Sequence, residues 1–404
     1  MKNLPSERNV SRRHLMQTAG AAAAGAFLLR EAVAQDENPA AQVADRGADL
    51  RITALRAYRL GGRVYVKIET NKDIHGWGEI TQSEPNVAKT LVLSLFNLLE
   101  GENPTRIEHL WQKLYRAHRD IRGGPLMTHA ISAIDEALWD ITGKAWGVPG
   151  YRLLGGPTRE KIRMYPSITS YKIGPGGPRP FAASPREIKG MVDHVAAIRK
   201  RLGPDGAIMV DAHCAFPPPH VIQLAAAIQP YDILFLEEPA VPGNIEVFKR
   251  IKEQVRIPLA TGERDRTIWG MIPYLQERCI DILQPDVGHT GGISQMKKIA
   301  TLAEAWFVPL VPHSSSTLLG LTASLHVTAS IPLFLIHEGG KGHDQAGVVK
   351  KNWEVSKDGY ASLPQGPGLG VEIDEKKVRK LDSAPQKAYR WPSGKNPDGS
   401  VADY

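Results

Sequence analysis

Six side chains that could bind a metal ion or move a proton recur at a nearly constant spacing in the second half of the chain. They are separated by 26, 26, 23, 27 and 25 residues, and they are Asp211, Glu237, Glu263, Asp286, His313 and Glu338. Most of them follow a short apolar run and precede a stretch with a helical pattern; the runs are Ile208–Val210, Ile233–Leu236, Pro258–Thr261, Ile280–Leu283, Val308–Val311 and Leu333–Ile336. A strand and its following helix take about this many residues, so the spacing predicts that all six lie at the same end of successive strands. A single carboxylate is more often a solvated loop residue, but that explanation does not account for six in register.

Three of the six, Asp211, Glu237 and Glu263, are carboxylates on neighbouring predicted strands. Carboxylates that converge on one point cannot all stay ionised unless a cation neutralises them. A hard cation with oxygen ligands meets that requirement, and Mg²⁺ is the first choice. The sequence therefore predicts one Mg²⁺ site per subunit.

Two histidines are candidates for acid–base chemistry. Asp286 and His313 fall on adjacent predicted strands, so Asp286 can orient the imidazole and raise its basicity, which makes His313 a candidate general base. His213 lies two residues after Asp211, so in an extended segment its side chain would point the same way and could act on the other side of a substrate. His289 and His337 adjoin these positions and are assigned at most a supporting role.

The elements that must position these side chains differ between the two halves of the chain. In the first half, Val64, Val66 and Ile68 alternate with polar residues as in a strand, and Gly76–Glu79 predicts a second strand with a close backbone approach. Helical patterns follow, and they cover Val87–Leu99, Ile107–Tyr115 and Thr128–Trp146. Strands first and helices afterwards predict an α+β domain. In the second half, alternating strands and helices predict a parallel α/β sheet that closes into a barrel.

These patterns predict six segments along the chain. They are a signal peptide at 1–34, a linker at 35–49, an α+β domain at 50–157, the barrel at 158–340, a C-terminal segment at 341–385 and a tail at 386–404. The barrel is expected to be irregular near its start, because the only evident helix between Lys161–Tyr165 and Asp211 is Ser184–Leu202. The residues before that helix include Gly174–Pro180, a run of helix breakers. Either a loop replaces the first barrel helix or a regular unit is missing, and no regular helix is expected between 166 and 180.

The first 34 residues have the pattern of an export signal. Arg12 and Arg13 precede the apolar run Ala19–Leu29, which is too short to span a membrane, and Ala32–Ala34 is a small-residue cleavage site. The pattern resembles a twin-arginine signal and predicts an extracytoplasmic or periplasmic protein; the alternative is an amphipathic helix with basic flanks. Of the 404 residues with a net charge of +7, this segment holds five basic and two acidic side chains, so the mature chain carries only +4. Neither a nucleic-acid partner nor, for the mature form, a membrane is expected.

The chain has two cysteines, Cys214 and Cys279. Cys214 follows the end of one predicted strand and Cys279 precedes another, so the two lie at opposite ends of the barrel. A disulfide needs Cα atoms within about 7 Å, so both are predicted to be free thiols.

The strand-end motifs resemble the enolase superfamily, in its mandelate racemase/muconate lactonizing enzyme branch. They read V-D-A-H, F-L-E-E-P, T-G-E-R, Q-P-D-V-G-H-T-G-G, V-P-H and H-E, with G-W-G-E earlier and L-P-Q-G-P-G-L-G near the end. The likeness runs from Arg51 to Val378 and is strongest to acid-sugar dehydratases of the galactonate dehydratase type. It implies an α+β capping domain, a modified (β/α)₇β barrel and a C-terminal segment that returns to the cap.

The resemblance also implies roles for the site residues. Asp211, Glu237 and Glu263 would bind Mg²⁺, Asp286 and His313 would form the base dyad, and Glu338 would exchange a hydrogen bond with the enolate. His213 would be the general acid that expels the β-hydroxyl of an acid sugar, giving a 2-keto-3-deoxy acid. Oligomers are common in the family, so by analogy a homo-oligomer is compatible with this chain.

Two other functions stay open. A racemase, epimerase or cycloisomerase would use the same scaffold, and many members of the branch carry a Lys-x-Lys pair for that purpose. This chain has only Lys172 in that region, which favours the dehydratase. A non-catalytic exported protein that binds sugar acids is the second alternative.

Overall fold

The computed structural model describes residues 47–167, 170–174, 185–339, 346–390, 394–395 and 399–402. The chain divides into two compact units, Met1–Ala48 and Asp49–Tyr404, and every helix and strand of the described ranges belongs to the second. The predicted signal peptide and most of the predicted linker lie outside the described residues, as does Ser184, the predicted first residue of a helix. None of the helices in the described ranges combines the length and the apolar character needed to cross a bilayer.

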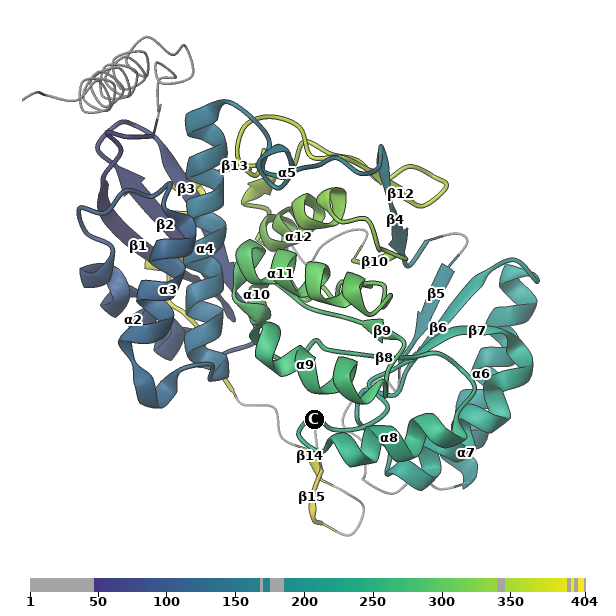
Figure 1. Cartoon of the computed structure of the whole chain (residues 1–404). Helices are drawn as coiled ribbons and strands as arrows, with labels where there is room; N and C mark the ends of the chain where they lie inside the picture. The colour runs from purple at the N-terminus through teal and green to yellow at the C-terminus, as the bar shows by residue number, and fades with distance from the viewer. Residues whose placement is uncertain are drawn as a thin grey trace, which may run out of the picture. The chain divides into compact units, whose positions relative to one another are not determined.

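The first part of this unit is an antiparallel sheet covered by helices (Figure 1). The strands pair in the order β1-β2-β3, and their bounds are β1 Ile52–Leu60, β2 Arg63–Thr70 and β3 His75–Ile80. The helices and short 3₁₀ turns are α2 Pro85–Ser94, η2 Leu95–Leu98, α3 Ile107–Ala117, η3 Arg119–Ile121, α4 Pro125–Trp146 and α5 Gly150–Leu153. We call residues 50–157 the cap.

Two glycines in β3 allow the longest cap helix, α4, to pack directly on the sheet. A Cβ built on Gly76 or on Gly78 would lie 2.0 Å from a backbone oxygen of α4, that of Ala137 or Ala133. No side chain can be accommodated at that distance, so the close approach predicted for Gly76–Glu79 is confirmed and explains why both residues are glycine.

The next part is a barrel of parallel strands with helices outside them (Figure 1). The strands are β4 Lys161–Tyr165, β5 Ser170–Ile173, β6 Ala207–Asp211, β7 Ile233–Glu237, β8 Leu259–Thr261, β9 Ile282–Leu283 and β10 His337–Glu338. The helices and one 3₁₀ turn are α6 Pro185–Leu202, α7 Pro218–Ile228, η4 Gln229–Tyr231, α8 Ile245–Gln254, α9 Thr267–Glu277, α10 Val287–Thr290, α11 Gly292–Ala305 and α12 Leu318–Ser330. Parallel pairing runs from β5 to β9, and β10 pairs in parallel with β4.

The strand expected at Val308–Val311 is reduced to isolated bridges, from Leu310 to Leu283 and to Phe334. Prolines at 309 and 312 explain the difference, because a proline has no amide hydrogen to donate to a neighbouring strand. The position of the seventh strand is kept without a regular ladder.

The barrel is irregular near its start, as predicted. Only residues 166–169 separate β4 from β5, and none of the described residues between 166 and 180 is helical; residues 168–169 and 175–180 are not described. On its other edge β4 pairs antiparallel with β12, a strand of the C-terminal segment. Hence β4 and β5 share no ladder within the described part of the chain.

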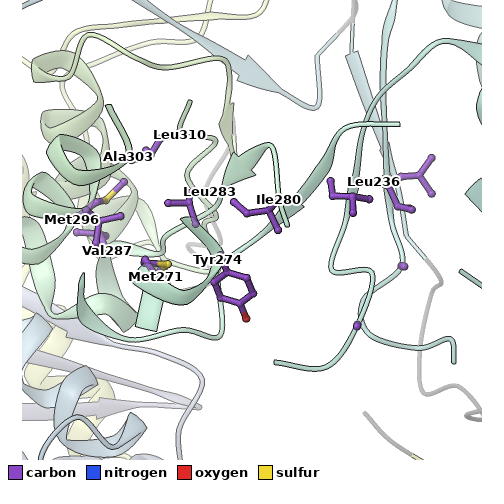
Figure 2. Packing of buried hydrophobic residues seen from close by; sticks show 14 of the residues in the cluster. Leu236, Met271, Tyr274, Ile280, Leu283, Val287, Met296, Ala303 and Leu310 are labelled. Atoms are coloured by element: carbon purple, nitrogen blue, oxygen red, sulfur yellow. The ribbon is translucent and has the colours of Figure 1, made fainter. Parts of the chain in front are cut away.

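The barrel buries apolar side chains on both faces of its strands. Inside it are Tyr165, Met209, Phe235, Ala260, Ile282, Val311 and Ile336. Between the strands and the outer helices lies a larger cluster, in which Leu236 and Leu283 from strands meet Met271, Tyr274 and Met296 from helices (Figure 2). Consecutive strand residues thus face opposite sides, for example Phe235 inward and Leu236 outward.

The C-terminal segment returns to the cap, as the resemblance implied. Its elements are β11 Val349–Lys350, β12 Tyr360–Ser362, β13 Glu372–Ile373, α13 Glu375–Ser383, β14 Gly394–Lys395 and β15 Val401–Ala402. Glu375 Oε2 lies 2.7 Å from Lys67 Nζ of β2, and Asp382 Oδ1 accepts a hydrogen bond from the Arg59 amide of β1 at 2.6 Å. Leu369 donates its amide to Asp140 of α4 at 2.9 Å.

A buried glutamate of the cap also binds the start of a barrel helix. Glu79, at the end of β3, accepts hydrogen bonds from the Thr317 amide at 2.8 Å, the Thr317 hydroxyl at 2.5 Å and the Gly320 amide at 3.3 Å. These amides open α12, the helix that follows His313. The cap therefore supplies hydrogen-bond acceptors for backbone groups that a helix start leaves unsatisfied. Elsewhere in the barrel, Cys214 and Cys279 are buried free thiols, as predicted.

Candidate active site

The alternation of side chains along the strands brings most of the predicted residues inside the barrel. Met209 and Phe235 face the interior, and so do positions two residues further on, which are Asp211 and Glu237. The same count places His313 after Val311 and Glu338 after Ile336. Each of these side chains therefore follows an inward apolar residue at the end of its strand.

Glu263 does not follow this count from Ala260, because an extended strand would turn it outward. Gly262, directly before it, has φ +135°, a conformation that side chains other than glycine rarely adopt. This backbone change brings Glu263 inward, where its Oε2 lies 3.4 Å from His313 Nε2. The glycine of T-G-E-R thus has a positional role.

The ammonium group of Lys172 lies among the carboxylates. It is 2.6 Å from Glu338 Oε1, 2.9 Å from Glu237 Oε1 and 3.4 Å from Asp211 Oδ2. Burial works against a charged lysine, but Glu237 and Glu338 outweigh it and raise the pKa of Lys172 well above its usual value. Lys172 therefore stays charged and joins three of the predicted residues.

The donor set fits a hard cation. Burial raises the pKa of Glu237 well above its usual value although Lys172 opposes this, and burial raises the pKa of Glu263 to about 7. The second oxygen of Glu237, Oε2, is buried and has no hydrogen-bond partner among the described residues. A buried acceptor without a partner is costly, and a cation beside it would remove that cost.

Two other groups of residues bring potential ligand atoms within 4.8 Å of one another. They are Asp211, His213 and Glu238, and Asp286, His289 and His313. The predicted set of Asp211, Glu237 and Glu263 is not one of these groups, and the Lys172 ammonium lies between two of its members. In the first group, Glu238 is already bound by Arg264 at 2.7 and 3.1 Å.

Asp286 and His313 form the predicted pair. His313 Nδ1 lies 2.7 Å from Asp286 Oδ2, and Asp286 Oδ1 accepts the Gly288 amide at 2.7 Å. Burial opposes the imidazolium, but the carboxylates of Glu263, Asp286 and Glu338 together raise the pKa of His313 well above its usual value. Asp286 stays ionised and holds the ring with Nε2 towards Glu263 and Glu338.

His213 reaches the cluster by a different route from the one predicted. The extended segment expected after Asp211 is wrong, because His213 has φ +47° and its amide donates to Asp211 Oδ1 at 2.7 Å, which turns the chain sharply. Its Nδ1 lies 3.6 Å from Asp211 Oδ2, and the neighbouring carboxylate raises the pKa of His213. The ring is 47% exposed, so it can meet a ligand entering from solvent.

Contacts link the two histidines through the whole cluster. His213 contacts Asp211, Lys172 joins Asp211 to Glu237 and Glu338, and the Glu338 Oε2 lies 3.9 Å from His313 Nε2. The two imidazoles therefore lie at opposite ends of one row of charged groups. This arrangement can give and take protons at two points of a bound anion.

Sequence reasoning missed two features of the site. Lys172 was left without a role, although Ile173 beside it faces outward, which would have placed Lys172 inward once β5 was recognised as a strand. His129 of α4 was not considered; its ring stacks on His289 with centroids 4.5 Å apart, and His289 Nδ1 lies 3.8 Å from Asp286 Oδ2. No local sequence signal pairs His129 with His289, because 160 residues separate them.

Comparisons with known proteins agree with this architecture. The family model for the mandelate racemase/muconate lactonizing enzyme N-terminal domain matches residues 42–155, and the model described as enolase C-terminal domain-like matches residues 159–377. The D-galactonate dehydratase of Ralstonia pickettii is 35% identical over 386 residues, which cover 88% of this chain and all of that protein.

Two solved structures are similar in fold and in sequence. An enolase from Agrobacterium radiobacter, proposed to be a galactarate dehydratase and solved with sodium and L-malate, has a TM-score of 0.78 at 32% identity, over 87% of this chain and 99% of that one. The 3,6-anhydro-D-galactonate cycloisomerase of Zobellia galactanivorans has a TM-score of 0.75 at 29% identity, over 82% of this chain and 99% of that one. The chain therefore belongs to the mandelate racemase/muconate lactonizing enzyme branch of the enolase superfamily.

Proposed function

We propose that this enzyme is a Mg²⁺-dependent lyase that dehydrates an acid sugar, an aldonate or aldarate, to a 2-keto-3-deoxy acid. The observation that carries the proposal is the pair of imidazoles, His213 and His313, at opposite ends of one buried carboxylate cluster. A dehydration needs a base for the α-proton and an acid for the departing hydroxyl. The resemblance to D-galactonate dehydratase supports the same reaction class.

His313 is the base in this proposal. Asp286, at 2.7 Å, fixes the ring and leaves Nε2 free to take the proton next to the substrate carboxylate. Because Glu263 is the first of the carboxylates that keep the His313 pKa high, His313 becomes a better base when Glu263 is occupied by a cation.

Asp211, Glu237 and Glu263 would hold the Mg²⁺ ion. When bound, this ion supplies positive charge where the substrate carboxylate gains negative charge as the proton leaves. Glu338, held by Lys172 and by the Ser314 amide at 3.3 Å, orients the same part of the substrate.

His213 is the acid. The carboxylate of Asp211 favours the protonated ring, and a protonated imidazole can donate to the β-hydroxyl as it leaves. Its exposed position leaves room for the substrate between the two histidines.

A racemase, epimerase or cycloisomerase is the second candidate. The structural similarity to a 3,6-anhydro-D-galactonate cycloisomerase favours it, because such reactions share the abstraction of the α-proton. The buried ammonium of Lys172 is a third group on the same cluster that could meet an anionic intermediate. A protein that only binds sugar acids would use the same charges without proton transfer.

The experiment that separates these functions incubates the full-length protein with Mg²⁺ and a set of aldonates and aldarates in D₂O. We expect 2-keto acid product from the wild-type protein, and neither product nor α-proton exchange from His313→Asn. In His213→Asn we expect product formation to fall by about 100- to 10,000-fold while exchange continues, since only the acid is lost. His109→Asn, an exposed histidine on α3, is the control.

Other outcomes contradict the proposal. Full 2-keto acid formation by His213→Asn would remove its role as the acid. Exchange with inversion and no 2-keto acid would favour the racemase or epimerase. Tight binding without exchange at saturating Mg²⁺ would favour the binding protein.

A further inference from the structure

A polar cavity lies beside the Asp286–His313 pair. It has a volume of about 410 Å³ and is lined by Gly62, Arg63, Thr81, Gln82 and Ser315. Four of these residues belong to the cap, and Ser315 follows His313 by two positions. A second cavity of about 420 Å³ shares Gly62 and Arg63 with the first. Arg63, the first residue of β2, therefore borders both spaces.

The first cavity adjoins the base pair directly. The amide and hydroxyl of Ser315 lie 3.4 and 3.5 Å from Asp286 Oδ2. A Cβ built on Gly288 would lie 3.3 Å from Asp286 Oδ1 and 3.9 Å from Thr81 Oγ1. The hydroxyls of Ser315 and Thr81 thus approach Asp286 from the cavity, so a molecule held near His313 can extend into it.

Two groups that line this cavity lack hydrogen bonds. Arg63 Nε and Thr81 Oγ1 are both buried, and neither has a partner within the described part of the chain. The nearby carboxylate of Glu79 does not supply one, because its oxygens already accept from Thr317 and Gly320. A buried donor without a partner costs free energy, so the pair is better satisfied by a ligand than by the protein alone.

The chemistry of the lining indicates what that ligand carries. A guanidinium binds a carboxylate through a planar fork of N–H groups, and hydroxyl and amide side chains such as Thr81 and Gln82 bind hydroxyl groups. A cavity of this size holds a small polyhydroxylated acid. A neutral end of a sugar acid would leave the positive charge of Arg63 uncompensated.

We infer that Arg63 binds a second carboxylate, at the end of the substrate remote from His313, and that the enzyme prefers dicarboxylic acid sugars (aldarates) to the corresponding aldonates. The inference rests on the proposed function for the identity of the reacting end. Arg63 is thus a residue that determines specificity and takes no part in moving protons.

The test compares sugar acids that differ only in the oxidation of C6: galactarate with galactonate, glucarate with gluconate, and mannarate with mannonate. With the full-length protein and Mg²⁺, we expect kcat/KM for the preferred aldarate to exceed that of its aldonate by at least about tenfold. Arg63→Met should remove this preference through a higher KM for the aldarate, with kcat largely kept. Arg63→Lys should keep part of it, since the charge remains without the planar fork.

Arg56→Met is the matched control. Arg56 lies in the same hairpin, on β1, and pairs with Glu69 at 3.2 Å on the surface, away from both cavities. Its removal should leave the ratio of the two kcat/KM values unchanged. Melting temperatures of all variants show that the proteins are folded; if Arg63→Met does not fold, Arg63→Gln and Arg63→Lys carry the comparison.

A binding measurement separates this inference from the proposed function. In His313→Asn, which cannot abstract the proton, calorimetry with galactarate and galactonate should show that adding Arg63→Met weakens galactarate binding by about tenfold or more and leaves galactonate binding unchanged. That result without any 2-keto acid from the wild-type protein would retain the inference and reject the dehydratase. Product from aldonates and aldarates alike, with an unchanged ratio in Arg63→Met, would retain the dehydratase and overturn the inference. Failure of all three aldarates to bind would also overturn it.

Discussion

Three carboxylates share one ammonium group at the centre of the candidate site. Lys172 Nζ lies 2.6 to 3.4 Å from Glu338, Glu237 and Asp211, all of them largely or wholly buried. Such a group is sensitive to the loss of its one cation, because buried charges left without a partner are strongly destabilising. The same carboxylates are those proposed for Mg²⁺, so lysine and metal serve the same charge balance.

This leads to a prediction for Lys172→Gln. We expect the variant without metal to lose about 3–5 kcal/mol of unfolding free energy, which is the usual cost of breaking a buried ion pair. Added Mg²⁺ should stabilise the variant more than the wild type, because more negative charge is uncompensated. Melting temperatures in EDTA and in a series of Mg²⁺ concentrations measure both effects.

Lys161→Gln is the control for that experiment, because Lys161 makes only an exposed ion pair with Asp358, at 3.4 Å. Its removal should change the melting temperature little. Equal melting temperatures of Lys172→Gln and wild type in EDTA would contradict the central position of Lys172.

Single residues also show the limit of sequence reasoning. The register of Asp211 and Glu237 could be predicted, because both follow regular strands with alternating side chains. The conformation of His213 could not, because a positive φ of +47° is uncommon for histidine and nothing in V-D-A-H announces it. Gly262 before Glu263 was visible as a motif, but its effect on the direction of Glu263 required the backbone.

At the scale of elements, α4 joins the cap to the barrel through α10 and α11. Asp135 of α4 is buried and accepts hydrogen bonds from the Ser294 amide at 3.0 Å and the Ser294 hydroxyl at 2.5 Å, at the start of α11. Burial raises the pKa of Asp135 from 3.8 to about 7, although Ser294 opposes the shift. The folded protein therefore binds a proton more tightly at this position than the unfolded chain does.

The consequence is a pH dependence of stability. Between pH 4 and pH 7 the folded state holds a proton that the unfolded state has released, so the contribution of Asp135 to stability falls as the pH rises through this window and levels off above it. The fall amounts to at most about 4 kcal/mol. We expect Asp135→Asn to be less sensitive to pH than the wild type when urea unfolding is measured at pH 5, 6, 7 and 8.

Asp193→Asn, a change of an exposed carboxylate on α6, should follow the wild-type curve. Parallel curves for Asp135→Asn and wild type would show that Asp135 is ionised in both states.

Elements with strong periodicity were predicted well and those without it were not. The helix expected at Thr128–Trp146 is the C-terminal part of α4, which begins three residues earlier because Gly124 and Pro125 start it. The strand at Val308–Val311 was predicted from its apolar residues, but prolines prevent a ladder there. Short β5 was not recognised, since four residues next to a run of glycines and prolines carry little pattern.

At the scale of the whole molecule, the order of cap, barrel and returning C-terminal segment followed from the sequence, whereas the contacts between them did not. The contact of His129 with His289 and that of Arg59 with Asp382 join residues 160 and 323 positions apart. Local patterns carry no information about such pairs. Specificity depends on these long-range placements, as the position of Arg63 at the cavities illustrates.

The N-terminal pattern gives a prediction for the fate of the chain in a bacterial cell. If Arg12 and Arg13 form a twin-arginine signal, the double change to lysine should keep the protein in the cytoplasm at its full length. Cell fractionation and N-terminal sequencing measure this: the wild-type protein should be found in the periplasm and begin near Gln35. The double change of Lys2 and Arg8 to glutamine, which leaves the arginine pair intact, is the control. A wild-type protein that stays full-length in the cytoplasm would contradict the prediction.

Glu79 of the cap closes the first turn of the barrel helix α12 with three hydrogen bonds, and α12 begins five residues after His313. A barrel joined to the cap of a relative would keep this helix start only if the donor cap brings an acceptor of the same reach. Recombination between members of the family is therefore constrained at a point that touches no substrate. New specificities are reached more readily by changing cap residues such as Arg63 one at a time than by exchanging whole caps.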